Sequence, residues 1–306
     1  MTSFKSGVLC AVGSYAIWGT LPLFWHLLLN IPPMQILASR IIFSFVFVAA
    51  LLLVLKKTKW LAHFKTAGKR NYFLLGALFI SCNWGLYIWA INSGHTIEAS
   101  LGYYINPLVS ILLGFFFLKE RLTPLQWAAF ILCAIGVSIP TVLSGTFPWI
   151  SVLLALTFGL YGLFKKKIVA DTLETLCCET LAALPIAAFL LLIPFAAINA
   201  SPETTALFGE KFYMSGIRLR DIVLLILAGP VTALPLLLFS QGARLIPLSA
   251  LGFVQFISPT ITLIIGIFIF HEPFGAANAV TFSFVAGGVL LYTLSLVQKS
   301  YFQRQR

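Results

Sequence analysis

Hydrophobic side chains occupy long, nearly unbroken runs along this chain, and short polar segments separate them. Ten such runs lie at about residues 7–30, 34–55, 72–93, 99–118, 124–144, 148–164, 176–198, 221–240, 248–270 and 275–297. A bilayer core about 30 Å thick needs roughly 20 apolar residues for one helical crossing. These runs are too long and too continuously apolar for the alternating strands of a membrane barrel. The pattern predicts an all-α integral membrane protein with ten transmembrane helices.

Composition supports this class. Of the 306 residues, 60% are hydrophobic and 9% are charged, against the usual quarter or so of charged residues in globular proteins. Little sequence remains outside the runs, so no soluble domain is expected. The first run is longer than the apolar part of a secretory signal and lacks a small-x-small cleavage site, which predicts a retained helix.

Motifs for catalysis or metal binding are missing from the sequence. The five cysteines lie in or at the ends of hydrophobic runs, without the spacing of a disulfide framework or a zinc site. The sequence also has no HExxH, P-loop or dinucleotide-binding glycine motif. We therefore expect no enzyme activity, no metal and no bound cofactor.

Basic residues are distributed unevenly among the polar segments. If the N-terminus is cytoplasmic, 16 of the 20 lysines and arginines fall in inside segments, including Lys165–Lys167, and three fall outside, while Arg40 lies within a helix. The positive-inside rule then predicts that both termini are cytoplasmic. The net charge of +11 therefore reflects membrane topology, and no nucleic-acid partner is expected.

An internal repeat relates two stretches, Leu101–Glu120 and Leu251–Glu272. A shift of 152 positions places Pro107 on Pro259, and both prolines are predicted to kink their helices. The Leu-Gly pairs that open the two copies are only 150 positions apart, so the second copy has two extra residues before its proline. This difference predicts two halves with unequal walls.

The repeat divides the chain into residues 1–145 and 146–306, with five predicted helices in each half. Because five is an odd number, the second half must enter the membrane inverted relative to the first. Inverted repeats are typical of secondary transporters, whose substrate site lies near the midplane where the repeats meet. The sequence therefore predicts a transporter that works by alternating access around a central cavity.

Two charged residues lie inside the predicted helices at matching positions of the two halves, Arg40 and Glu179. An arginine at the centre of a bilayer costs on the order of 3 kcal/mol even on insertion scales, so Arg40 needs a partner. One interpretation is that both residues only stabilise the bundle. The other is that Arg40 attracts an anionic group of the substrate and that Glu179 gates transport or carries a proton.

Amides and aromatic rings at membrane depth provide further candidates. Asn83, Asn106 and Gln255 would each be unfavourable without a partner, and either interhelical hydrogen bonds or substrate contacts would satisfy them. Asn106 and Gln255 lie just before the two prolines of the repeat. The aromatic rings near these amides are suited to contact a partly apolar solute, and they are Trp84, Tyr87, Tyr103 and Tyr104.

Five ordered motifs resemble those of RarD-type members of the EamA family in the drug/metabolite transporter superfamily. They are EASLGYYINPL (98–108), YGLFKKK (161–167), ETLAALP (179–185), PLLLFSQGARL (235–245) and LGFVQFISPT (251–260). The resemblance implies a bacterial inner-membrane carrier of two inverted five-helix repeats, with its fifth and tenth helices peripheral. The positions that match the family pattern, and are thereby implied as substrate-binding candidates, are Trp18, Arg40, Asn83, Trp84, Tyr103, Asn106, Tyr161, Glu179 and Gln255.

The predicted function is secondary transport of a small organic solute, an amino acid or another anionic or zwitterionic metabolite. Related small multidrug exporters use a glutamate of their first helix to exchange protons for cationic drugs. Neither the first nor the sixth predicted helix here contains an acid, which argues against simple antiport of cationic drugs. An exporter of drugs or toxic compounds remains an alternative, as does a receptor or assembly subunit that transports nothing. The lipid bilayer and the solute are the expected partners, with proton coupling through Glu179, and the protein is expected to be a monomer or a homodimer.

Overall fold

A computed structural model describes residues 2–57, 59–92, 95–145, 147–168, 170–196, 218–271 and 275–304. All regular structure in these ranges is helical. The first half contains α1 (Thr2–His26), α2 (Pro33–Val54), η1 (Lys59–Lys65), α3 (Ala67–Asn92), α4 (Thr96–Leu118) and α5 (Pro124–Ser144). The second half contains α6 (Trp149–Lys167), α7 (Thr172–Ala196), α9 (Leu219–Leu245), α10 (Leu248–Gln255), α11 (Ile257–Phe268) and α12 (Ala276–Arg304).

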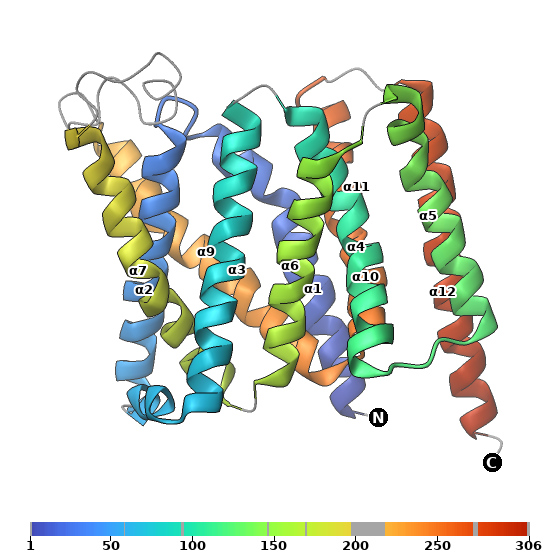
Figure 1. Ribbon diagram of the computed structural model, residues 1–306, viewed down its shortest axis with the longest axis horizontal. Coiled ribbons are helices and arrows are strands. Elements are labelled where there is room, and N and C mark those ends of the chain that lie inside the picture. Colours follow the sequence, from blue (N-terminus) through green and yellow to red (C-terminus); the bar gives the residue numbers. More distant parts are fainter. Residues whose placement is uncertain are drawn as a thin grey trace.

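The helices stand side by side as a bundle, and both ends of the chain lie at the same face (Figure 1). We call this the terminal face. Within the described residues, eight spans are long and apolar enough to cross a membrane, with α10 and α11 together counted as one of them, and α5 contains a shorter apolar stretch, Pro124–Ile139. The chain is therefore a multi-pass membrane protein, while the number of ten crossings stays a prediction.

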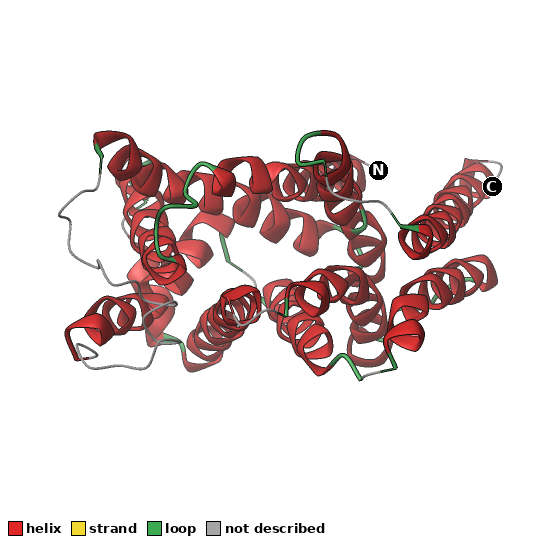
Figure 2. Cartoon of the chain, turned by 90° about the horizontal axis from the view of Figure 1, so that it is seen from above, coloured by secondary structure: helices red, strands yellow, loops and turns green. Residues whose placement is uncertain are grey.

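Helices α5 and α12 form a pair at the edge of the bundle, seen from above in Figure 2. A Cβ atom at Gly136 would approach Phe284, and one at Gly288 would approach the Sγ atom of Cys133. The two helices therefore pack closely on each other through small residues, as membrane helices commonly do. The peripheral position expected for the fifth and tenth helices is confirmed.

The predicted continuous run 248–270 is wrong in one respect, because the structure divides it into α10 and α11 at Phe256. The corresponding helix of the first half, α4, continues without interruption through Pro107. The break lies three residues before Pro259, within the segment that carries the two extra residues of the second repeat copy. The two extra residues thus lie where the helix of the second copy is interrupted and that of the first is not.

Two glycines allow the halves to approach closely. A Cβ atom at Gly252 of α10 would lie 2.7 Å from the Pro107 carbonyl oxygen of α4, and one at Gly229 of α9 would overlap Phe43 of α2. Ser44 strengthens the second crossing by donating a hydrogen bond to the Gly229 carbonyl oxygen over 3.0 Å. Both contacts join a helix of the first half to a helix of the second.

Glu120 joins the same two halves at the terminal face. Its carboxylate accepts hydrogen bonds from the backbone N–H groups of Leu248 and Ser249, over 2.7 and 2.9 Å, and from the Ser249 hydroxyl over 2.7 Å. Free N–H groups and the positive end of the helix dipole favour a carboxylate at a helix N-terminus. Glu120 therefore caps α10, whereas its repeat counterpart Glu272 lies outside the described residues.

Candidate functional site

Arg40 lies one third of the way along α2, and two indole rings contact it. Its guanidinium carbon is 4.8 Å from the centre of the Trp25 ring and 4.5 Å from the centre of the Trp84 ring. Its Nε atom donates a hydrogen bond to Thr232 Oγ1 over 3.1 Å. Cation–π contacts and one hydroxyl thus hold the charge without neutralising it.

Among the described residues, no carboxylate pairs with Arg40. Tyr87 and Tyr103 are its other electrostatic neighbours, and their rings lie 5.5 Å apart in an edge-on arrangement. Tyr103 is 46% exposed although it belongs to this cluster. The cation and the tyrosines together can hold a solute that has both an anionic group and an apolar part.

Glu179 has a different environment. Its Oε2 atom lies 2.6 Å from Lys165 Nζ, and the side chains of both residues are almost completely buried. The hydroxyl group of Tyr161 donates a longer hydrogen bond to the same oxygen, over 3.5 Å. Its other oxygen, Oε1, has no hydrogen-bond partner among the described residues. A Cβ atom at Gly76 would lie only 2.9 Å from Oε1, so this glycine of α3 provides the space for the carboxylate.

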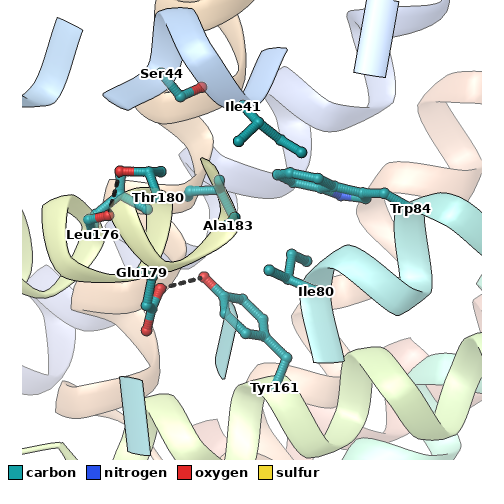
Figure 3. Close-up of a pocket in the computed structure, with 10 residues that line it drawn as sticks. Ile41, Ser44, Ile80, Trp84, Tyr161, Leu176, Glu179, Thr180 and Ala183 are labelled. Carbon is teal, nitrogen blue, oxygen red and sulfur yellow. Dashed lines mark hydrogen bonds between the residues drawn. The ribbon is translucent and has the colours of Figure 1, made fainter. Parts of the chain in front are cut away.

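A small cavity lies next to Glu179, and Trp84 forms part of its lining. Its volume of about 20 Å³ is enough for one water molecule. Figure 3 shows Glu179 and Tyr161 on one side of it and the Trp84 ring on another. Because Trp84 also contacts the Arg40 guanidinium, this indole separates the cation from the cavity next to Glu179.

Arg40 and Glu179 occupy matching positions. Each lies seven residues after the first residue of its helix, Pro33 in α2 and Thr172 in α7. At 1.5 Å per residue this is about 10 Å from the helix start. The predicted correspondence between the two residues therefore agrees with the helix boundaries, and the two side chains bind different partners.

Trp18 and Tyr161 meet in an aromatic cluster at the centre of the bundle. Phe239 contacts both: its ring stacks on Tyr161 with centres 5.7 Å apart and lies 5.6 Å from Trp18. Phe158 also contacts Trp18, at 5.6 Å. The cluster lies between α1, α6 and α9 and fills the space between the halves.

The amides have mainly interhelical partners. Asn83 donates two hydrogen bonds to α6, to the Leu154 carbonyl oxygen over 2.8 Å and to Thr157 Oγ1 over 3.0 Å. Gln255 Oε1 accepts from the hydroxyl groups of Tyr15 and Ser110, both over 3.4 Å. Asn83 therefore connects α3 to α6, and Gln255 connects α10 to α1 and α4.

Asn106 differs from the other two amides. It is buried next to Pro107, and its Oδ1 atom has no hydrogen-bond partner among the described residues. An unsatisfied buried acceptor is unfavourable by about 1–3 kcal/mol. Asn106 is consequently the amide with acceptor capacity left for a solute or a water molecule.

Two residues of the site were not predicted from the sequence. Lys165 was assigned to a basic loop, but its side chain is buried and paired with Glu179. Its position in a run of three lysines concealed this role, since such a run is typical of a cytoplasmic helix end. Trp25, the second ring on Arg40, was not singled out because aromatic residues are common near membrane boundaries.

Comparisons with known proteins identify the family of this chain. A model of the EamA-like transporter family matches residues 5–141. The uncharacterized transporter YojE of Bacillus subtilis is 44% identical over 298 residues, which cover 96% of this chain and 95% of that protein. Protein RarD of Escherichia coli is 37% identical over 302 residues, which cover 98% and 97% of the two chains.

The chain is a RarD-type member of the EamA-like transporter family. A crystal structure of a protein that is 18% identical matches this RarD-type fold with a TM-score of 0.71, covering 95% of this chain and 98% of the other. Family membership and the apolar helices identify a multi-pass membrane transporter.

Proposed function

We propose that this RarD-type protein is a secondary carrier of a small anionic or zwitterionic organic solute, such as an amino acid. Arg40 carries the proposal, because it is a guanidinium in a membrane-spanning helix with two indoles, one hydroxyl and no carboxylate partner among the described residues. A solute carboxylate would complete its coordination, and arginine suits this role because its planar fork can bind a carboxylate through two hydrogen bonds.

The neighbouring rings support the same class of solute. Tyr87, Tyr103 and Trp84 lie around the guanidinium, so the apolar part of the solute would contact aromatic faces while its anionic group faces Arg40. The two halves would rock about this region to open it to each side of the membrane in turn, as in other carriers with inverted repeats. Both termini would lie in the cytoplasm.

Uptake into proteoliposomes tests the proposal. A mixed pool of labelled amino acids, nucleosides and organic acids is offered to vesicles with the native chain, with Arg40→Gln, and with Arg121→Gln as a control that removes an exposed arginine. Accumulation of an anionic or zwitterionic solute that stops in Arg40→Gln and persists in Arg121→Gln is the expected result. Uptake of a labelled cationic drug, offered separately, without uptake from the pool would favour the multidrug alternative, and equal uptake by empty vesicles would favour the non-transporting one.

Proton coupling is a separate part of the proposal. Glu179 is the acid of α7 that lies within the bundle, with Lys165 as its counter-ion and a water-sized cavity beside it. Protonation of Glu179 would leave Lys165 without its counter-ion. Binding of a proton to Glu179 would therefore change how α6 packs against α7. A carrier coupled to protons requires such a link between proton binding and conformation.

A further inference from the structure

A groove at the terminal face is separate from the Arg40 site. Its volume is about 530 Å³, within the range of sites that bind small molecules. Four helices border this open groove: α1, α2, α7 and α9. Its lining includes Lys57, Asp171, Thr172, Leu234, Leu238 and Arg244.

The groove exists because α9 changes neighbours along its length. At Gly229 it contacts α2, whereas at Gly242 it contacts α1, where a Cβ atom would lie 3.2 Å from Ala11. The two glycines are 13 residues apart, or about 20 Å along the helix. Over that distance α9 leaves α2 and leans toward α1, and Figure 1 shows its slanted course behind α2 and α7. The groove is therefore a wedge-shaped gap between α2 and α9 that widens toward the terminal face, and we call it the wedge.

The walls of this wedge are apolar. Leucines of α9 form one side of it, and Leu234 among them is 49% exposed. In a membrane-spanning helix this exposure is toward lipid, because water is absent at that depth. An acyl chain can therefore enter the wedge from the bilayer and contact Leu234 and Leu238.

The mouth of the wedge is polar and has an unneutralised cation. Arg244 Nη1 donates a hydrogen bond to Thr172 Oγ1 over 3.1 Å and has no ion-pair partner among the described residues. The Asp171 carboxylate would repel an anion, but it is already paired with Lys57 at 2.7 Å. The three charged groups together carry a net charge of +1.

We propose that this groove binds a phospholipid with a net negative charge, with its phosphate on Arg244 and one acyl chain along the leucines of α9. A guanidinium binds phosphate oxygens through paired hydrogen bonds, and basic pockets between membrane helices are suited to anionic headgroups. The bound lipid would connect the inner ends of α2, α7 and α9. This inference does not depend on the identity of the transported solute.

Retention of lipid by the purified protein tests it. The detergent-solubilised native chain, Arg244→Gln, Arg244→Lys and the control Arg121→Gln are titrated with phosphatidylglycerol or phosphatidylcholine, and bound lipid is counted by native mass spectrometry. The native chain and Arg121→Gln should retain one phosphatidylglycerol. The affinity of Arg244→Gln should fall about tenfold, as expected for one charged hydrogen-bonding partner, and Arg244→Lys should lie between the two.

Three results would overturn the inference. Equal retention of phosphatidylcholine would mean that only the apolar wall binds lipid. Equal affinity of Arg244→Gln and Arg121→Gln would mean that Arg244 does not bind the headgroup. Complete displacement of the lipid by millimolar glycerol phosphate would mean that the groove takes a free small anion. Melting temperatures without added lipid show whether each variant is folded, and Arg244→Lys keeps the test valid if Arg244→Gln is not.

Discussion

Lys165 Nζ lies 2.6 Å from Glu179 Oε2 in the interior of the bundle. The pair joins α6 to α7, and Tyr161 adds a hydrogen bond from one turn earlier in α6. Removing one member of a buried ion pair leaves an uncompensated charge, which costs about 3–5 kcal/mol.

Replacing either partner alone should destabilise the protein more than replacing both. We expect Lys165→Met and Glu179→Gln each to lower the free energy of unfolding by about 3 kcal/mol, and the double variant to recover at least half of that loss. Thermal or denaturant unfolding in detergent measures all three variants. Additive losses in the double variant would show that the two charges do not stabilise each other.

Glu179→Gln should also abolish the proton dependence of transport, because an amide keeps the shape of the carboxylate but cannot bind the coupled proton. The measurement is uptake at several external pH values, with a fixed solute, in proteoliposomes. Glu174→Gln is the control, since Glu174 lies in the same helix but pairs with His63 near the terminal face. An unchanged pH profile in Glu179→Gln would rule out this residue as the proton carrier.

Glu120→Gln should weaken the junction between the halves at the terminal face. The neutral side chain loses the charge-assisted bonds to the first N–H groups of α10, and caps of this kind contribute about 1–2 kcal/mol. Unfolding of Glu120→Gln and of the neighbouring exposed variant Arg121→Gln can be compared directly. The expected loss should appear in Glu120→Gln alone.

Gly252→Ala should destabilise the crossing of α10 and α4. The added methyl group would lie 2.7 Å from the Pro107 carbonyl oxygen and 2.8 Å from the Ile111 side chain, and overpacking of this kind costs about 1–3 kcal/mol. Gly85→Ala is the matched control, because a Cβ atom there would meet no other atom within 4 Å. Equal melting temperatures for the two variants would contradict the close approach of these helices.

The ion pair between Asp171 and Lys57 should stabilise the protein by an amount that depends on pH. Burial raises the pKa of Asp171, but the hydrogen bond from Lys57 and two backbone N–H groups outweigh it, so the pKa lies below its ordinary value. The hydrogen bond to Asp171 likewise raises the pKa of Lys57.

The stabilisation by Asp171 is therefore complete above the ordinary carboxyl pKa of about 4 and is lost as the pH falls through the lowered value. At pH 7 the melting temperature of Asp171→Asn should be lower than that of the native protein. This difference in melting temperature should shrink at pH values below about 4. Melting temperatures across this range provide the measurement. A difference that is constant with pH would exclude a charge effect.

Sequence alone determined the class of this protein and the order of its helices. Hydropathy is a local property, since each segment exchanges water for lipid nearly independently of its neighbours, so helix existence can be read along the chain. The internal repeat can also be read along the chain, because matching glycines and prolines recur at a fixed spacing in the two copies. The charged positions of α2 and α7 could also be matched in this way.

Only the tertiary structure decided which side chains meet. Lys165 belongs to a run of three lysines in the sequence, and its burial against Glu179 depends on the rotation of α6 and the packing of α7. The stacking of Trp25 and Trp84 on Arg40 joins three helices, and the wedge beside Arg244 depends on how α9 slants from α2 to α1. Helix rotation and crossing result from packing over the whole bundle, and a one-dimensional pattern does not contain them.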